Sequence, residues 1–317
     1  MKRSFAGLLL LCLVALPFTG LMAAAPRMIN SPEDLAMLAS DPEGSFALGQ
    51  DIDMQAIDWQ PFAFRGSLDG RGYSIRNLRV TRPGTDGPQS IDGNHKRYDT
   101  EYIGLFSALE EAEIRDLHLE NLSLSLTTQG NCFAGGIAGS ATRSNITGCS
   151  VSGRVYVAQE GPIGGVAGIV GFGSGKITDC SVDVELVFIG DKKGVSCEQF
   201  LGGIISNGFA DLEGCRVKMR GWASVRGYAH NGGLVGMYHV FTRHGDKHDG
   251  YVRDCEVDAT IRFYERNTKD RRAYCKPYLG EKLHKTVTVK GNRTIHFEGK
   301  ESRNYKQPLL PKDYQLP

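Results

Sequence analysis

Residues 164–188 read GGVAGIVGFGSGKITDCSVDVELVF and join a glycine-rich run to an alternating run. From Cys180 to Phe188 every second residue is apolar, and most of these residues are β-branched or aromatic. This period of two predicts a strand with one buried face. The glycines raise a second possibility, a phosphate-binding loop. That pattern fails, because Val170 stands where the first glycine of GxxxxGK belongs and Ile177 follows Lys176 where Ser or Thr is needed.

Two signatures of this stretch recur five times in the same order along the chain. The first is a glycine followed by small or apolar residues: IGLFS 103–107, GGIAG 135–139, GGVAG 164–168, GGIIS 202–206 and GGLVG 232–236. The second opens each alternating run: IRDLHL 114–119, ITGCSV 146–151, ITDCSV 177–182, LEGCRV 212–217 and VRDCEV 252–257. Short strands repeating about every 30 residues without helices between them predict an all-β, right-handed parallel β-helix, with the glycines at its corners.

Stacked coils would align equivalent residues in ladders about 4.8 Å apart. The second signature then predicts one interior ladder of cysteines, formed by Cys149, Cys180, Cys215 and Cys255. Leu117 takes the same place in the first repeat, so burial rather than metal ligation is the expected requirement. Three further cysteines, Cys132, Cys197 and Cys275, are candidates for a disulfide. In the first repeat the parity changes after Leu119, which predicts a bulge near Asn121.

The ends of the chain differ from the repeats. Residues 1–25 have a basic start, an apolar run and small residues, which predicts a secretory signal peptide cleaved near Ala23 or Ala24. Residues 26–45 contain Ser31-Pro32-Glu33-Asp34, typical of a short capping helix at the N-terminal end. The solenoid is expected over 46–299, with its repeats at 102–263 and a closing segment after them, and 300–317 are expected to form a tail.

The two signatures resemble the GLUG-motif repeat. The resemblance rests on Gly104-Leu105-Phe106, Gly136-Ile137-Ala138-Gly139, Gly165-Val166-Ala167-Gly168 and Gly233-Leu234-Val235-Gly236, and on the element around each ladder cysteine. It covers about residues 46–263. It implies a bacterial secreted or surface protein with a β-helical scaffold, as in adhesin-like proteins. Some family members are IgA-specific metallopeptidases whose activity lies in a separate HExxH domain, and this sequence contains no HExxH.

Residue types that could bind a metal or act as catalytic carboxylates occur in several places along the sequence. His244, Asp246 and His248 form the densest cluster of metal-ligand types, although Gly245 argues against a shared helix face, and a polar loop is the simpler interpretation. Paired carboxylates would suit a polysaccharide-degrading enzyme. The candidates are Asp69, Asp86, Asp92, Asp179, Asp183, Asp254 and Asp258. Asp179 and Asp254 recur at equivalent positions with Asp116, which favours a structural turn.

These observations predict an exported, non-catalytic binding or adhesion module for a glycan or a host or cell-surface protein. They imply no cofactor, no catalytic residue and no transmembrane segment. A β-helical polysaccharide lyase or glycoside hydrolase, and a structural component of a surface assembly, remain as alternatives. Residues 262–317 carry 14 Lys and Arg against 6 Asp and Glu, and a solvated terminal segment explains them more simply than an anionic partner such as nucleic acid.

Overall fold

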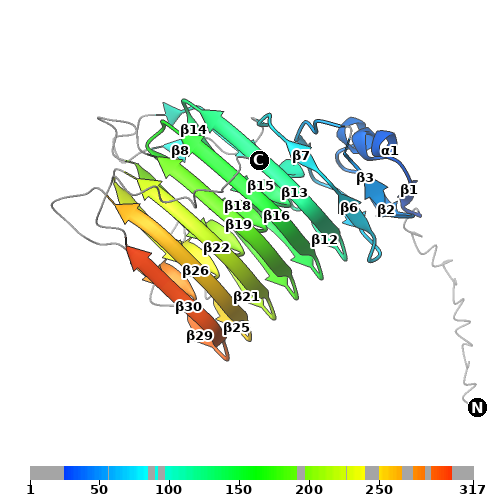
Figure 1. Ribbon diagram of the computed structural model, residues 1–317. Coiled ribbons are helices and arrows are strands. Elements are labelled where there is room, and N and C mark those ends of the chain that lie inside the picture. The colour runs from blue at the N-terminus through cyan, green and yellow to red at the C-terminus, as the bar shows by residue number, and fades with distance from the viewer. Residues whose placement is uncertain are drawn as a thin grey trace, which may run out of the picture.

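The computed structural model is a right-handed parallel β-helix, as predicted, in which three sheets run along one axis (Figure 1). It describes residues 25–55, 57–84, 90–91, 97–190, 197–225, 227–239, 250–265, 274–282 and 287–301. The predicted signal peptide and tail therefore lie almost wholly outside the described residues. Among the described helices, none is long and apolar enough to cross a bilayer.

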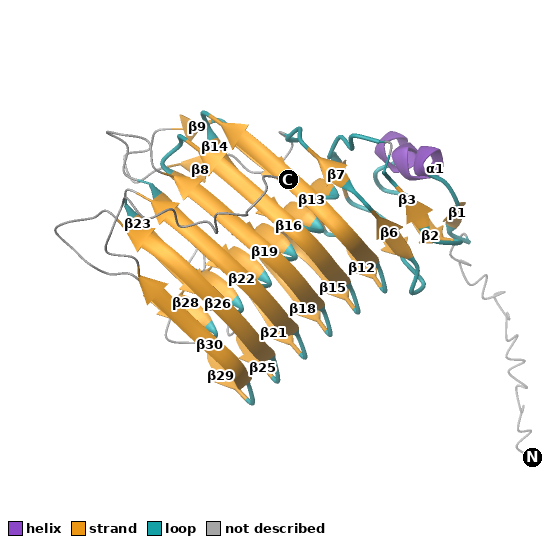
Figure 2. Ribbon diagram, viewed as in Figure 1, coloured by secondary structure: helices purple, strands orange, loops and turns teal. Residues whose placement is uncertain are grey.

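Each coil contributes strands to the three sheets, here named A, B and C (Figure 2). Sheet A has 13 strands: β1 (Arg27–Ile29), β2 (Ser45–Leu48), β4 (Ala63–Phe64), β5 (Ser67–Asp69), β11 (Phe106–Glu110), β12 (Glu113–Arg115), β15 (Ala138–Thr147), β18 (Val170–Thr178), β21 (Ile205–Glu213), β24 (Val235–Tyr238), β25 (Tyr251–Arg253), β28 (Leu279–Lys282) and β29 (Thr288–Lys290). Sheet B has nine: β3 (Ile52–Asp53), β6 (Ser74–Arg76), β7 (Arg79–Val80), β13 (His118–Thr128), β16 (Ser150–Gln159), β19 (Ser181–Gly190), β22 (Arg216–Val225), β26 (Glu256–Glu265) and β30 (Arg293–Glu301). Sheet C has six: β10 (Thr100–Ile103), β14 (Asn131–Gly135), β17 (Ile163–Ala167), β20 (Glu198–Gly202), β23 (Tyr228–Gly232) and β27 (Tyr274–Lys276). A separate antiparallel pair joins β8 (Ser90–Ile91) to β9 (Arg97–Tyr98).

The predicted cysteine ladder is confirmed at the corner between sheets A and B. The backbone N–H after each ladder cysteine donates to the carbonyl of the preceding one, from Ser181 to Cys149 at 2.9 Å and from Arg216 to Cys180 at 2.8 Å. All four ladder cysteines are at most 1% exposed, and Leu117 occupies the same row below Cys149. The position therefore selects for small apolar side chains that fill the core.

The residue before each ladder position adopts a left-handed backbone, and its identity alternates between aspartate and glycine. The row reads Asp116 (φ 48°), Gly148 (65°), Asp179 (53°), Gly214 (65°), Asp254 (55°) and Gly291 (71°). Each aspartate carboxylate lies where a Cβ on the glycine of the next coil would project. Two aspartates cannot occupy adjacent coils, because the first fills the space of the second. Asp179 and Asp254 are therefore turn residues, as expected from the sequence, and they recur in every second coil because a glycine must stand between them.

The corner between sheets C and A corrects one alignment made from the sequence. Gly136 stacks on Gly168 of the next coil and not on Gly165. The Gly136 N–H donates to the Gly168 carbonyl at 3.0 Å, and the Gly168 N–H donates to the Gly203 carbonyl at 3.0 Å. Gly165 instead lies inside β17, paired with Phe133 and Phe200. Likewise, Gly171 to Gly175 lie within β18 and form no corner. The repeated segment in this coil is Gly168-Ile169-Val170-Gly171, and the spacings from Gly104 become 32, 32, 35 and 30 residues.

The disulfide candidates are also corrected: all seven cysteines in the described residues are free thiols. Cys132 lies on β14 and Cys275 on β27, and Cys197 immediately precedes β20. At least one strand of sheet C separates each of these positions from the next. Two strand spacings amount to about 10 Å, whereas a disulfide needs Cα atoms within about 7 Å. The stacking of the coils therefore keeps these three thiols apart.

The free thiols are expected to be unreactive in the folded protein. Burial raises the pKa of Cys132, and it raises the pKa of Cys197 and Cys275 to about 12. Because the thiolate is the nucleophile and the four ladder thiols are at most 1% exposed, a thiol-specific disulfide reagent at mild alkaline pH should modify these seven thiols slowly in native protein and rapidly after denaturation. Lys176→Cys, at an exposed position, is the matched accessible control. Rapid modification of the native wild type would contradict this expectation.

The N-terminal end is closed by a short helical segment, as predicted. Helix α1 (Pro32–Ala36) begins after Ser31, whose hydroxyl accepts from the Asp34 N–H at 3.1 Å, and a 3-10 turn (Met37–Ser40) follows. Leu35 and Leu38 are fully buried against the first coil. β1 precedes the helix and pairs with β2, so sheet A begins before the predicted start of the solenoid.

Candidate functional site

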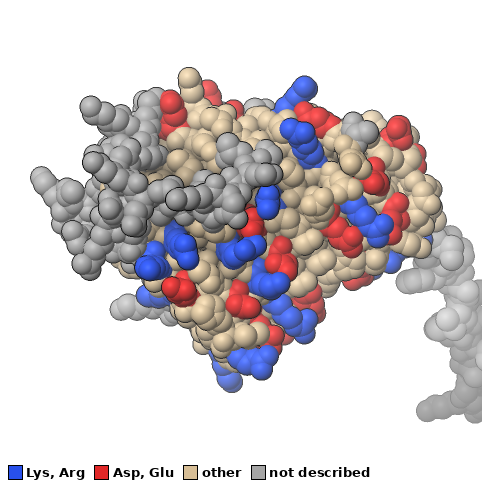
Figure 3. Space-filling model, in the orientation of Figure 1, with Lys and Arg blue, Asp and Glu red and all other residues tan. Residues whose placement is uncertain are grey.

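The outer face of sheet B carries two parallel rows of polar side chains, because strand alternation points every second residue outward. In-register pairing aligns the first row as Ser152, Asp183, Lys218 and Asp258, and the second as Ser123, Arg154, Glu185, Arg220 and Thr260. The rows therefore run along the solenoid axis, across the strands. In Figure 3, Lys and Arg side chains alternate with Asp and Glu across the face turned to the viewer.

A groove of about 840 Å³ lies between and beside these rows. We call it the sheet-B groove; it is lined by Asn121, Leu122, Ser123, Gly153, Arg154, Asp183, Val184, Glu185, Lys218, Met219, Arg220, Asp258 and Thr260. Leu122, Val184 and Met219 are at most 3% exposed and point into the core, so the strand backbone between the two rows forms the floor of the groove. The lining residues come from β13, β16, β19, β22 and β26. At about 4.8 Å per strand, the groove extends over about 19 Å.

Ion pairs order the charged side chains of the groove. The Arg154 Nε lies 2.9 Å from one carboxylate oxygen of Glu185, and the Arg220 guanidinium lies 2.5 Å from the other. Glu185 is only 15% exposed between them. The Lys218 Nζ donates to Asp183 at 2.7 Å, and this hydrogen bond raises the pKa of Lys218. The lining thus holds three cations and three anions, and its formal charge is zero.

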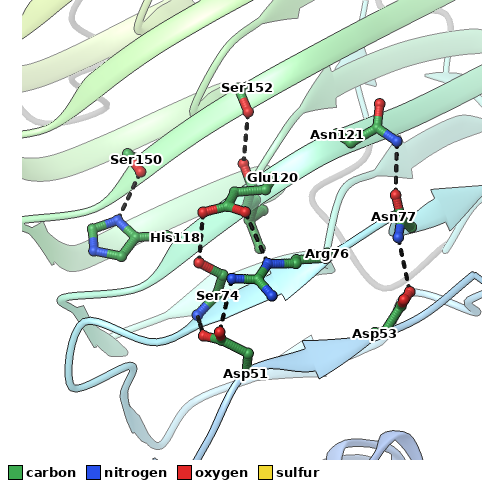
Figure 4. A network of polar contacts seen from close by, with 11 residues as sticks. Asp51, Asp53, Ser74, Arg76, Asn77, His118, Glu120, Asn121, Ser150 and Ser152 are labelled. Atoms are coloured by element: carbon green, nitrogen blue, oxygen red, sulfur yellow. Dashed lines mark hydrogen bonds and ion pairs between the residues drawn. The ribbon is translucent and has the colours of Figure 1, made fainter.

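The end of the groove near β13 adjoins a polar network built on the predicted bulge (Figure 4). The register of β13 shifts between Leu119 and Leu122, and Asn121 has a φ of 54°, which confirms the bulge. The Asn121 side-chain amide donates to Asn77 at 2.7 Å, and Asn77 donates to Asp53 at 2.9 Å. These side-chain hydrogen bonds stabilise the left-handed backbone at Asn121, which lines one end of the groove.

A second network beside it consists of Arg76, Glu120, Asp51 and Ser74 (Figure 4). Arg76 contacts Asp51 at 2.7 Å and Glu120 at 2.9 Å, and the Ser74 hydroxyl donates to Glu120 at 2.8 Å. Hydrogen bonds from Ser74 and Arg76 lower the pKa of Glu120. These polar groups bind one another, so the sheet-B groove is the better candidate for binding a ligand.

The carboxylates considered from the sequence fall into four groups. Asp183 and Asp258 lie in the sheet-B groove, two strands apart with Lys218 between them. Asp69 instead accepts from the Arg115 guanidinium at 2.7 Å, and Asp179 and Asp254 occupy the turn row. Asp86 and Asp92 lie outside the described residues.

The metal candidates His244, Asp246 and His248 lie outside the described residues. Within those residues, no group of three or more His, Cys, Asp or Glu side chains is placed to hold a metal ion.

A histidine on sheet C, not singled out from the sequence, lies between two carboxylates. The His230 Nδ1 is 2.8 Å from Glu281 and its Nε2 is 3.3 Å from Glu198. Its ring stacks on Phe200 at 5.2 Å and on Tyr274 at 5.4 Å. With only 5% of the side chain exposed, His230 cross-links neighbouring coils of sheet C to sheet A and presents little surface to a ligand.

The sequence did contain a signal for the groove. Its two rows stand three and five residues after the ladder cysteines, so alignment on Cys149, Cys180, Cys215 and Cys255 brings Arg154, Glu185 and Arg220 together. Of the groove residues, only Asp183 and Asp258 were considered from the sequence, as catalytic carboxylates. The row becomes visible only when outward positions are compared between coils.

Comparison with known proteins places the fold but not the activity. The sequence matches no protein-family model and no curated protein. A solved structure described as "IgA1 Protease" superposes with a TM-score of 0.50 and 14% identity, covering 86% of this chain and 21% of that chain. A putative immunoglobulin A1 protease from Bacteroides ovatus gives 0.42 and 17%, with 84% of each chain covered. This chain thus spans about a fifth of the length of the first structure, and at such identities the similarity concerns the β-helical fold alone.

Proposed function

We propose that this protein is an exported, non-catalytic β-solenoid that binds a neutral glycan in the sheet-B groove. The observation that carries the proposal is the groove itself, a trough across five strands in which carboxylates alternate with guanidinium and ammonium groups. Export is supported by the signal-like residues 1–25 and by the resemblance of the repeats to GLUG motifs.

The ligand class follows from hydrogen-bonding capacity and charge. Sugar hydroxyls both donate and accept, so they can bridge a carboxylate and the cation beside it. Asp183 and Lys218 offer such a pair, and Arg154, Glu185 and Arg220 offer two more. Because the groove has equal numbers of positive and negative groups, it gives a polyanion or polycation no net attraction. A neutral, polyhydroxylated chain extended along the solenoid axis fits both properties.

The test measures affinity for a panel of neutral and acidic glycans by calorimetry. D183A/K218A removes a balanced ion pair from the groove, and R143A/E111A removes an exposed balanced pair that lies on sheet A, away from the groove. Loss of the groove pair should weaken binding roughly thirtyfold or more, because two or more hydrogen bonds of about 1 kcal/mol each are lost. The control should bind like wild type. Affinity should change little with salt, since screening acts on charged ligands.

Other outcomes would replace the proposal. Equal binding by both double variants would move the ligand away from the groove, and a steep loss of affinity with salt would indicate an acidic polymer. New reducing ends or unsaturated products would favour a glycoside hydrolase or lyase. That alternative rests on Asp183 and Asp258, which stand about 10 Å apart across Lys218. Recovery of envelope proteins without any glycan binding would favour a structural role.

A further inference from the structure

The C-terminal coil presents an open edge. β30 pairs with β26, and β29 pairs with β25; neither has a second neighbour among the described strands. Ile295 on β30 is 59% exposed, and Val289 on β29 is 40% exposed. An exposed strand edge with apolar side chains is a template for pairing with another strand.

The opposite end of the solenoid is a poor source of that strand, because its edge strands β1 and β3 are only three and two residues long. There the first coil is covered by α1 and the following 3-10 turn, with Leu35 and Leu38 fully buried (Figure 1). Head-to-tail stacking of copies is therefore blocked by the helical cap. Two copies can meet through their open ends only with two-fold symmetry, which makes the paired edge strands antiparallel.

The sequence of β30 is self-complementary in that orientation. When Phe297 opposes Phe297 of a second copy, His296 of each copy lies opposite Glu298 of the other. Pairing with β26 shows that both side chains point to the outer face, since His296 pairs with Asp258 and Glu298 with Thr260. Ile295 is the extra residue of a bulge, because Thr294 and His296 pair with the consecutive residues Val257 and Asp258. The regular self-pairing is therefore centred on His296, Phe297 and Glu298.

We infer that two copies of this chain associate tail to tail by antiparallel pairing of β30 about Phe297. The pairing continues sheet B from one protomer into the other and covers the open edge of β30 in each. The two-fold axis repeats each His296–Glu298 contact, so a change in either residue acts twice. The inference is independent of glycan binding, because it rests on the terminal coil alone.

Sedimentation equilibrium of the full chain over a wide concentration range tests it. Wild type should show a monomer–dimer equilibrium. H296E sets carboxylates opposite each other and should raise the dissociation constant roughly tenfold or more, whereas H296E/E298K should restore it. Met37→Lys, at a 53% exposed site on the capped end, is the control and should dimerise normally. Thermal unfolding of each variant separates lost association from lost folding.

Three results would overturn the inference. The first is a wild type that stays monomeric at every concentration. The second is a dimer weakened equally by M37K and H296E, or one that H296E/E298K does not restore. The third is a monomeric full chain that dimerises only after residues 302–317 are removed, which would assign the edge to the chain's own terminal segment.

Discussion

Replacing Gly173 with alanine is expected to lower the free energy of unfolding by about 2–6 kcal/mol. Gly173 has a φ of 140°, a region that residues with a side chain rarely adopt, and such strain costs about 1–3 kcal/mol. A Cβ there would also overlap the carbonyl oxygen of Ala141 on the preceding coil. Backbone atoms cannot move aside without breaking the ladder, so a further cost of about 1–3 kcal/mol is expected.

Urea unfolding followed by far-UV circular dichroism measures this effect. Lys176→Ala, three residues along the same strand and exposed, is the matched control and should unfold like wild type within about 0.5 kcal/mol. If G173A and K176A unfolded at the same urea concentration, the close approach of the two coils at this position would be wrong.

The architecture was predictable because its two signals are periodic. Alternation from Cys180 to Phe188 fixes which side chains face the core, and recurrence of the cysteine fixes which residues share a row. Both depend only on neighbours along the chain and on counting between repeats. The cysteine ladder and the bulge at Asn121 followed directly and are confirmed.

The corner at Gly168 shows where counting fails. The run from Gly164 to Gly171 contains two places where a glycine opens a small or apolar segment, and the sequence alone cannot distinguish them. The choice is made by contacts in space: Gly165 lies between Phe133 and Phe200, whose rings stack at 6.5 Å, while Gly168 continues the hydrogen-bonded corner. Alignment on Gly165 gives spacings from Gly104 of 32, 29, 38 and 30 residues, and this unevenness was the sign of the misalignment.

The groove depends on coil-to-coil contacts in a different way. Arg154, Glu185 and Arg220 are separated by 31 and 35 residues, and each alone is an ordinary outward-facing strand residue. Their ion pairs exist because parallel strands stack in register. Asp183 and Asp258 stand out in the sequence as candidate catalytic carboxylates. The cations between the acidic residues do not, because they become apparent only when outward-facing positions are compared between coils.

Removing a complete coil is expected to leave a folded protein. Deleting Asp179 to Glu213, 35 residues, joins Thr178 to Gly214. Thr178 and Glu213 are in register, so the corner closes at the same place, and Ser150 then pairs with Arg216. Gly148 and Gly214 become neighbours in the turn row, which avoids two adjacent aspartates. Arg154 then lies beside Arg220, and this like-charge contact is expected to cost less than about 1 kcal/mol.

Removing one residue should do far more harm than removing these 35. Deletion of Val184 alone shifts the rest of β19 by one position, so Glu185 turns into the core while Leu186 and Phe188 turn outward. The coil deletion should give a cooperative thermal transition at a lower Tm, because solenoid stability is approximately a sum over coils and their interfaces. The Val184 deletion should give insoluble protein or no cooperative transition. The reverse order of stabilities would mean that register between coils does not determine this fold.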